Sequence, residues 1–278
     1  QFLFVSIFFI TFKLLGYKLA SNLGAFIGSV FGPIFRSKKL INENIKNLYP
    51  KINKIDLEKI KNEMWKNYGR IFADYMSIKN FRQSKLDQYL KIEGKEIFEE
   101  IKKNKEQVIF ISGHFNNFEL MAMEIEKSGI DVAAIYRPLN NIFLNKIMER
   151  IRKKYICKYQ IKKGIGGIKK LIHLKKSNYS SALMIDQRVS QGIESNFFSQ
   201  KALTTTIPAQ LVKKFNIPVV PIFIERIKNT SFKIIVKNPI IFDKEETTQN
   251  ITDRLNLVLE KMIVYKPEQW IWSHNRWK

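Results

Sequence analysis

The sequence has few of the residues that most often build metal or disulfide sites. It contains one cysteine, Cys157, and three histidines, at positions 114, 173 and 274. A single cysteine excludes a disulfide framework and is typical of a reducing compartment. Neither the His-Glu-x-x-His spacing of zinc enzymes nor a Gly-x-Ser-x-Gly nucleophile turn occurs. We therefore expect an activity that uses no metal, no cofactor and no serine nucleophile.

Acidic residues are scarce relative to basic ones. The chain carries 48 Lys and Arg against 25 Asp and Glu, a formal net charge of +23. Such a charge attracts nucleic acids, anionic membrane surfaces and acidic proteins. The basic residues are spread along the chain without a zinc finger, an RNP-like motif or a basic arm, so we expect no nucleic-acid partner. An anionic lipid surface together with an acidic protein partner accounts for the charge equally well.

Residues 1–35 form an apolar segment interrupted only by Lys13 and Lys18. Joined to residues upstream of Gln1, or continued to Phe35, the segment is long enough to span a bilayer or to lie at its surface. Small residues recur every four positions and favour close helix packing: Ala20, Gly24, Gly28 and Gly32. The alternative is a buried helix pair of a soluble domain. A basic flank follows at residues 36–39 and favours the cytoplasmic side of a membrane. We expect a membrane-associated region at 1–35 and a catalytic domain at 36–278.

Short apolar strands and amphipathic helices alternate through the rest of the chain. The predicted strands are Val108–Ser112, Val132–Tyr136, Ala182–Ile185, Pro218–Ile224 and Phe232–Val236. The predicted helices are one capped by Asp56 and running to about Met76, then Lys95–Lys103, Glu119–Lys127, Ile142–Lys154, Gly167–Leu174, Pro208–Phe215 and Thr247–Val264. This alternation predicts an α/β sandwich with a mostly parallel or mixed central sheet.

The most informative segment follows the first of those strands and contains His114 and Glu119. On one helix, residues five apart lie roughly 140° apart around the axis, so the two side chains would diverge. They can meet only if His114 lies in the loop and Glu119 in the first turn of the next helix. A neutral imidazole takes a proton from a hydroxyl, and a carboxylate can orient it. We therefore expect His114 as a general base oriented by Glu119.

The segment resembles the His-x4-Asp/Glu box of the lipid A late acyltransferases, which belong to the glycerolipid acyltransferase superfamily. That box reads approximately Gly-His-x-Gly-Asn-Trp-Glu. His114, Asn117 and Glu119 fit it, whereas Asn116 replaces the glycine and Phe118 the tryptophan.

Further segments support the resemblance. Tyr136-Arg137-Pro138 resembles a family segment in which the arginine can bind a phosphate; satisfying strand-end carbonyls is the alternative role for Arg137. Asp186-Gln187 also has a family counterpart, and Asp186 either serves the site or anchors its loop. The family carries an arginine corresponding to Arg150 or Arg152.

A later loop and the C-terminus complete the resemblance. Phe198 and Thr205 fit a family loop, with Ser199 in place of a glycine. The aromatic residues of this loop would wall an acyl-chain slot, and capping of the next helix is the alternative role of its threonines. The C-terminal segment 267–277 matches the pattern Pro-x-Gln-Trp-x-Trp-x-His-x-Arg-Trp, in which we expect a structural role for His274.

The resemblance implies a glycerolipid-acyltransferase-like fold, no cofactor, and acyl transfer at the cytoplasmic face of the inner membrane. The implied donor is an acyl carrier protein thioester, and the implied acceptor is a hydroxyl of a lipid A precursor of the Kdo-lipid IVA type. Substrate contacts are expected from Asn117, Arg137, Arg150, Arg152, Asp186, Gln187, Phe198 and Thr205. Two alternatives stay open: an acyltransferase acting on a lysophospholipid, glycolipid or aminoacyl lipid, and a basic membrane- or nucleic-acid-binding module with a vestigial site.

Overall fold

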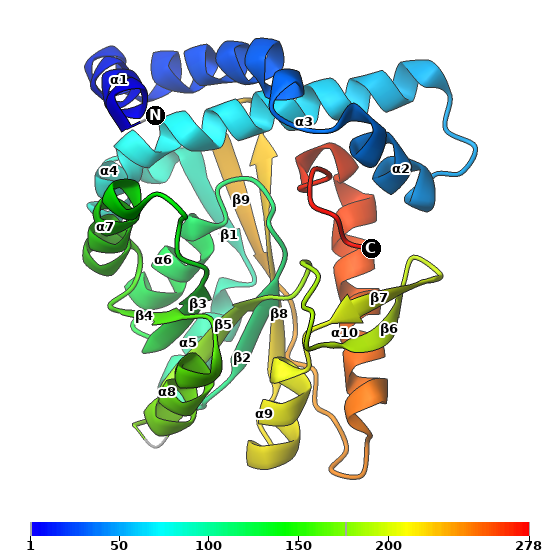
Figure 1. Cartoon of the computed structure of the whole chain (residues 1–278). Helices are drawn as coiled ribbons and strands as arrows, with labels where there is room; N and C mark the ends of the chain where they lie inside the picture. Colours follow the sequence, from blue (N-terminus) through cyan, green and yellow to red (C-terminus); the bar gives the residue numbers. More distant parts are fainter. Residues whose placement is uncertain (1, 176, 278) are drawn as a thin grey trace.

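A seven-stranded sheet forms the centre of the computed structural model, which describes residues 2–175 and 177–277 (Figure 1). The strand order is β1-β9-β8-β2-β5-β3-β4, and only the β8–β9 pair is antiparallel. The strands are β1 (Leu90–Glu93), β2 (Ile109–Ser112), β3 (Val132–Tyr136), β4 (Tyr159–Lys162), β5 (Ser180–Met184), β8 (Val219–Ile227) and β9 (Ser231–Val236). The predicted α/β class with a mostly parallel central sheet is confirmed.

The two edge strands of the sheet, β1 and β4, were not predicted from the sequence. β1 and β4 lie at the two edges, are four residues long and carry charged residues such as Glu93 and Lys162. Short, charged edge strands are how sheets avoid pairing with other chains, so they lack the apolar run that marks a central strand. A separate hairpin of β6 (Ile193–Phe197) and β7 (Gln200–Thr204) was also not predicted.

Helices cover the sheet at positions close to those predicted. They are α5 (Lys95–Lys103), α6 (Glu119–Lys127), α7 (Ile142–Ile151), α8 (Ile165–Lys175), α9 (Ile207–Phe215) and α10 (Thr248–Tyr265), with a short α4 (Ile78–Arg82). Single turns of other helix types are η1 (Gly32–Ile34), η2 (Tyr75–Ser77), η3 (Asp87–Tyr89), η4 (Arg152–Ile156) and η5 (Pro267–Gln269). α7 therefore ends earlier than predicted, because the chain widens into the π-helical turn η4.

An N-terminal layer of long helices lies across one end of the molecule, at the top of Figure 1. It consists of α1 (Phe2–Phe31), kinked at Gly16, with α2 (Lys38–Leu48) and α3 (Lys54–Asp74). The small-residue ridge of α1 packs on α3: a Cβ added at Gly24 would lie 2.4 Å from the carbonyl oxygen of Gly69. The residue that caps α3 is Asn53, which accepts a hydrogen bond from the Asp56 main-chain nitrogen at 2.9 Å, so the expectation that Asp56 is the cap was wrong.

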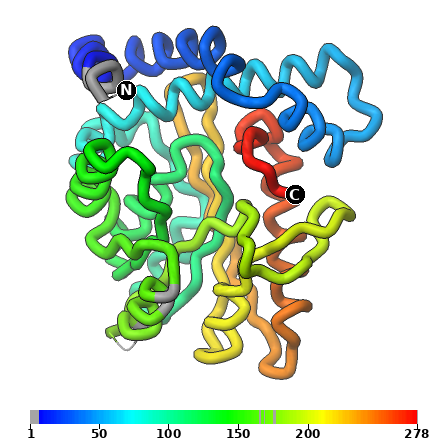
Figure 2. The backbone as a smooth tube through the Cα atoms, in the orientation of Figure 1, coloured from blue at the N-terminus to red at the C-terminus, as the bar shows by residue number. Residues whose placement is uncertain are grey.

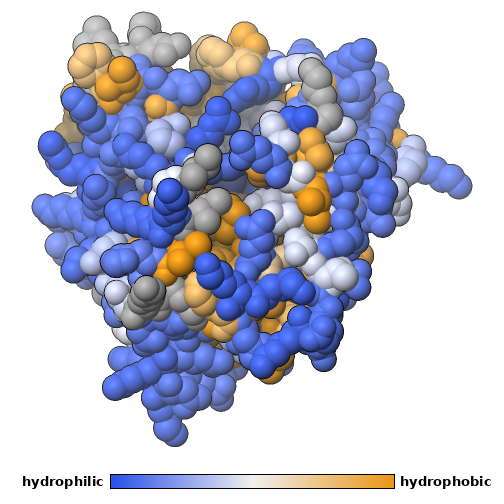
Figure 3. All heavy atoms as spheres, turned by 60° about the horizontal axis from the view of Figure 1, so that its bottom comes forward, coloured by the Kyte–Doolittle hydropathy of each residue, from blue (hydrophilic) through white to orange (hydrophobic). Residues whose placement is uncertain are grey.

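The outward face of α1 is apolar and exposed to solvent. Ile7–Ile34 is long and apolar enough to cross a membrane by length and composition, a criterion that core helices and signal sequences also meet. Only 28% of its most apolar window is buried, and Leu14 and Phe26 are among the exposed side chains. Elsewhere, the side of the molecule seen in Figure 3 is mostly hydrophilic, with hydrophobic side chains confined to a few clusters.

The chain after α10 returns to this N-terminal layer (Figure 2). The Asn44 side chain in α2 donates to the main-chain oxygen of Trp272 at 2.8 Å. Trp270, Trp272 and Arg276 are among the largest fully buried side chains. The C-terminal aromatic segment thus belongs to the core and joins α2 and α3 to the end of the sheet at which the site lies.

Candidate active site

His114 lies in the loop between β2 and α6, and its partner is Asp186. The imidazole Nδ1 is 2.7 Å from Asp186 Oδ1, and the main-chain nitrogen of His114 donates to Oδ2 at 2.8 Å. β2 and β5 are neighbours in parallel register, with Ser112 opposite Met184, so the loops that leave their carboxyl ends meet. Residues 72 positions apart are therefore brought together by strand pairing.

Asp186 is fully buried and is fixed by a third donor. The indole Nε1 of Trp270 donates to its Oδ2 at 2.9 Å. Burial raises the pKa of Asp186, but the charge and hydrogen bonds of His114 outweigh it and lower that pKa to about 2. Burial in turn lowers the pKa of His114, and the nearby Asp186 carboxylate outweighs it, so that this pKa lies above its ordinary value of 6.5. An ionised Asp186 thus fixes the tautomer with hydrogen on Nδ1 and leaves Nε2 for a substrate.

Glu119 lies in the first turn of α6, as predicted, but it binds other partners. Its Oε1 accepts from the Arg152 guanidinium, with Nε at 2.7 Å, and from the hydroxyl of Tyr75. The expectation that Glu119 orients the imidazole is corrected, because Asp186 occupies Nδ1. Glu119 remains close enough to contribute, after Asp186, to the raised pKa of His114. Phe118 packs edge-on against the imidazole, with ring centroids 4.9 Å apart.

His114 and Glu119 line a cavity of about 620 Å³, within the range usual for ligand sites. Four cationic side chains line it: Arg36, Arg137 and Lys163 are exposed and mark its mouth, whereas Arg152 is buried and lies on its wall beside Glu119. Its apolar part is lined by residues of β2, β3, β5 and α6: Phe110, Ile111, Ala134, Ile135, Ala182, Leu183, Met184, Met121, Ala122 and Ile125. The cavity therefore extends from a polar mouth into an apolar space between α6 and the sheet.

The structure separates the predicted contact residues into two groups. Those that line the cavity are Arg137, Arg152, Gln187 and Thr205, with Asp186 behind His114. The others lie elsewhere: Asn117 is fully buried outside the lining, Arg150 is exposed on α7, and Phe198 lies at the turn of the β6–β7 hairpin. Of the two arginines that the sequence left unresolved, Arg152 is thus the one that reaches the cavity.

Two residues of the cavity lining, Lys163 and His274, were not predicted to lie there. Lys163 follows the edge strand β4 and lines the mouth beside Arg137. Its pKa is lowered, mainly by partial burial and to a smaller extent by the charge of Arg137. Recognising β4 would have placed Lys163 at a strand end next to the Arg137 loop. His274 lines the cavity too. Its Nε2 accepts from the Arg188 main-chain nitrogen at 3.1 Å, and burial lowers its pKa, so it is the hydrogen-bonded histidine that the sequence predicted.

Both positions at which a motif glycine is replaced have positive φ angles. Asn116 has φ 41° and Ser199 has φ 60°, a region that glycine adopts freely and asparagine tolerates. Asn116 also donates to the Ile224 carbonyl at 3.2 Å and to the Gln269 side chain. Both replacements therefore occur at positions where a glycine would adopt the same backbone without strain, and Asn116 adds a link to the C-terminal segment.

Comparisons with known proteins identify the family of the chain. The family model described as bacterial lipid A biosynthesis acyltransferase matches residues 1–278. A lipid A biosynthesis myristoyltransferase of Escherichia coli K12 is 26% identical over 259 residues, covering 91% of this chain and 78% of that protein. A lipid A biosynthesis lauroyltransferase of the same organism is 21% identical over 276 residues, covering 95% and 87%.

Among solved structures, the 1-acyl-sn-glycerophosphate acyltransferase PlsC of Thermotoga maritima covers 91% of this chain and 98% of its own. Its TM-score is 0.42 at 12% identity, a likeness too slight to bear on fold or function. The family model, in contrast, spans the whole chain and includes the His114 loop and the residues around it. The chain belongs to the bacterial lipid A biosynthesis acyltransferase family.

Proposed function

We propose that the protein transfers a fatty acyl chain from an acyl carrier protein thioester to a hydroxyl of a lipid A precursor of the Kdo-lipid IVA type. One observation carries the proposal: the His114–Asp186 pair opens onto a cavity with a cationic mouth and an apolar interior. The relatives are named for lipid A myristoyl and lauroyl transfer. The exposed apolar face of α1, followed by Arg36, supports action at the cytoplasmic face of the inner membrane.

The reaction follows from the free nitrogen of His114. Nε2 takes the proton of the acceptor hydroxyl while its oxygen attacks the thioester carbonyl carbon. The resulting oxyanion collapses, the carbon–sulfur bond breaks, and the thiolate receives the proton from the imidazolium. Asp186 stabilises that imidazolium and keeps the ring oriented. Arg152, held by Glu119, supplies positive charge on the cavity wall for the oxyanion.

The two parts of the cavity suit the two substrates. Arg36, Arg137 and Lys163 at the mouth favour an acceptor that carries phosphates. Beyond His114 the lining becomes apolar between α6 and the sheet, where Met121, Ala122 and Ile125 face the strands. We place the donor acyl chain in that apolar part, with its thioester beside His114. The net charge of +23 favours encounter with an acidic carrier protein.

The test is a transfer assay with detergent-extracted protein, radiolabelled acyl carrier protein thioesters and a tetra-acylated lipid A precursor. We expect labelled product from the wild type and about 10²- to 10⁴-fold less from His114→Ala. His173→Ala is the matched control, because His173 is exposed on α8 and does not line the cavity. If label appears only in lipids of a total membrane extract, the acceptor is another lipid and the proposed acyl-transfer chemistry stands. Absence of transfer to every acceptor would overturn the proposed function.

A further inference from the structure

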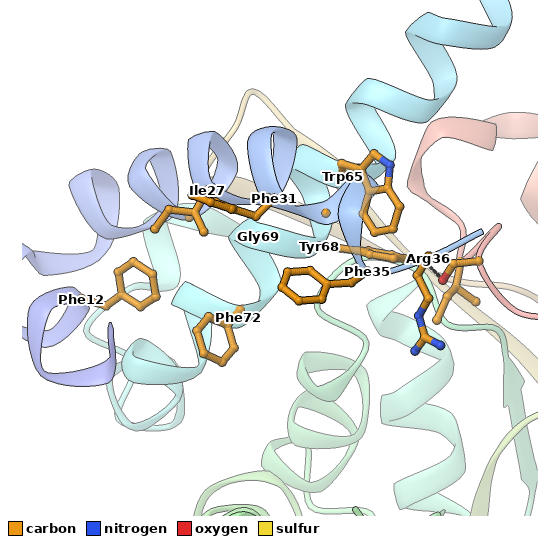
Figure 4. A pocket seen from close by; sticks show the side chains of 14 residues that line it. Phe12, Ile27, Phe31, Phe35, Arg36, Trp65, Tyr68, Gly69 and Phe72 are labelled. Carbon is orange, nitrogen blue, oxygen red and sulfur yellow. Dashed lines mark hydrogen bonds between the residues drawn. The ribbon is translucent and has the colours of Figure 1, made fainter. Parts of the chain in front are cut away.

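A second hollow lies outside the cavity already described, between α1 and α3 (Figure 4). Its volume is about 320 Å³. Its walls are mainly aromatic, aliphatic and glycine residues: Phe12, Gly24, Ile27, Gly28, Phe31, Gly32, Phe35, Trp65, Tyr68, Gly69 and Phe72. We refer to it as the α1–α3 groove. From Trp65 to Phe72 on α3 it extends about 10 Å, at roughly 1.5 Å per residue.

Glycines form the floor of the groove, and aromatic rings form its sides. The close approach of Gly28 to the carbonyl oxygen of Trp65, 2.2 Å from an added Cβ, leaves no room for a side chain between the helices. Phe31 and Phe35 flank this floor and are 49% and 77% exposed. Exposed aromatic rings beside an apolar hollow are a surface that water solvates poorly and that hydrocarbon would cover favourably.

The groove adjoins the cavity that contains His114. Arg36, Ile271 and Ser273 line both hollows. Tyr68 and Ser273 are 3.3 Å apart through their hydroxyls at this junction. Figure 4 shows Arg36 at one end of the row of aromatic side chains, with its guanidinium directed away from them. A molecule at the junction therefore meets a positive charge on one side and an apolar track on the other.

We propose that the α1–α3 groove holds an acyl chain that the lipid acceptor already carries, while Arg36 binds the acceptor's anionic headgroup. This inference rests on the proposed function and names a second part of its acceptor site. The apolar space between α6 and the sheet is placed beyond His114 and accommodates the donor chain. The groove opens instead in the helical layer whose outer face is apolar, so a chain can move from a lipid phase into it without crossing water.

Binding in the groove is tested first by photolabelling. The probe is a tetra-acylated lipid A precursor with a diazirine at the end of one acyl chain, added without donor to detergent-dispersed protein. We expect label on peptides that contain Phe31, Phe35, Trp65 or Phe72. Label confined to peptides of α6 and β2 would overturn the inference, because the acceptor chain would then share the donor's space. Since no acyl transfer is involved, this readout is independent of the proposed reaction.

A pair of double variants tests the groove in turnover. Phe31→Ser/Phe35→Ser removes exposed groove residues. Leu14→Ser/Leu19→Ser removes apolar residues of α1 that are also exposed but do not line the groove. Each buried methylene contributes roughly fourfold in affinity. We expect the groove variant to raise KM about tenfold for the long-chain acceptor, with kcat unchanged.

The second acceptor has the same headgroup with its chains shortened to four carbons, and we expect its KM to be unchanged by the groove variant. An equal rise in KM in both double variants would overturn the inference, because it would report a general apolar effect. Failure of wild-type transfer with both acceptors would contradict the proposed function, while the photolabelling result would still decide whether the groove binds the chain.

Discussion

Two buried carboxylates flank the His114 loop, and they differ in what they bind. Asp186 accepts from the main chain and ring of His114 and from Trp270. Glu119 accepts instead from Tyr75 and from Arg152. One carboxylate therefore sets the tautomer of the imidazole, and the other fixes a cation on the cavity wall.

The difference separates sequence proximity from chemical partnership. Glu119 is five residues from His114, whereas Asp186 is 72 residues away and is joined to it through the β2–β5 pairing. The five-residue spacing of the motif shows that the loop and the first helical turn bring both residues to one cavity, but it does not show that they bind each other. The hydrogen bonds to His114 depend on which strands are neighbours, because the carboxyl ends of parallel strands share one edge.

Asp186→Asn is expected to have the largest effect of the substitutions that separate the two carboxylates. Three N–H donors point at Asp186, and an asparagine amide cannot accept from all of them, so the tautomer of His114 is no longer fixed. The corresponding change in the Ser-His-Asp triad of a serine protease lowers kcat about 10⁴-fold. We expect a loss of about 10³- to 10⁴-fold in kcat here, measured by single-turnover acyl transfer.

The pH dependence provides the control for that substitution. Burial lowers the pKa of His114, but Asp186 outweighs burial and holds this pKa above 6.5. Because His114 can accept a proton only when it is neutral, we expect the wild-type rate to rise with pH through that raised pKa. Without the carboxylate the residual rate should rise at lower pH. The folded protein also gains stability from the low pKa of Asp186, about 2, which is lost as pH falls from about 4 toward that value. An unshifted kinetic profile would contradict the assignment.

Glu119→Gln is expected to lower kcat less, by about 10²-fold, through displacement of Arg152. Glu124→Gln is the matched control, since Glu124 is also buried on α6 but pairs with Lys127 away from the cavity lining. Both variants should lose stability, because each leaves a cation with a weaker partner. Only Glu119→Gln should lower kcat and shift the kinetic profile to lower pH, by less than Asp186→Asn does. Equal activities of the two variants would show that Glu119 is structural only.

Particular residues show how far the sequence predicts this molecule. The central strands and the start of α6 at Glu119 follow from apolar runs and helical spacing. The structure has α6 starting at Glu119 and the strands within a few residues of their predicted bounds. The pairing of His114 with Asp186 does not follow, because strand order is set by tertiary packing. Lys163 was missed because its edge strand is short and charged. Phe198 was expected in an acyl slot, but the β6–β7 hairpin carries it to a turn that packs on Trp277.

Arg137→Ala tests the mouth of the cavity beside which Asp186 and Glu119 lie. Arg137 and Lys163 lie close enough for one charge to lower the pKa of the other, which favours a bound anion between them. We expect KM for a phosphorylated acceptor to rise about tenfold, as for loss of a charged hydrogen bond, with kcat unchanged. Arg150→Ala is the control, because Arg150 is exposed outside the cavity lining. Initial rates at two ionic strengths give the KM of each variant for the acceptor. Equal KM values for Arg137→Ala and Arg150→Ala would contradict a role for Arg137.

Asn116 lies in the loop between His114 and Glu119, and its substitution should have the smallest effect on activity. Asn116→Gly keeps the backbone at φ 41° accessible but loses the hydrogen bonds to Ile224 and Gln269, so we expect about 1 to 2 kcal/mol less stability and a nearly unchanged kcat. Asn116→Ala loses the same bonds and adds about 1 kcal/mol of left-handed strain. Denaturant unfolding should therefore rank Asn116, then glycine, then alanine. Alanine at least as stable as glycine would mean that positive φ does not constrain the loop holding His114.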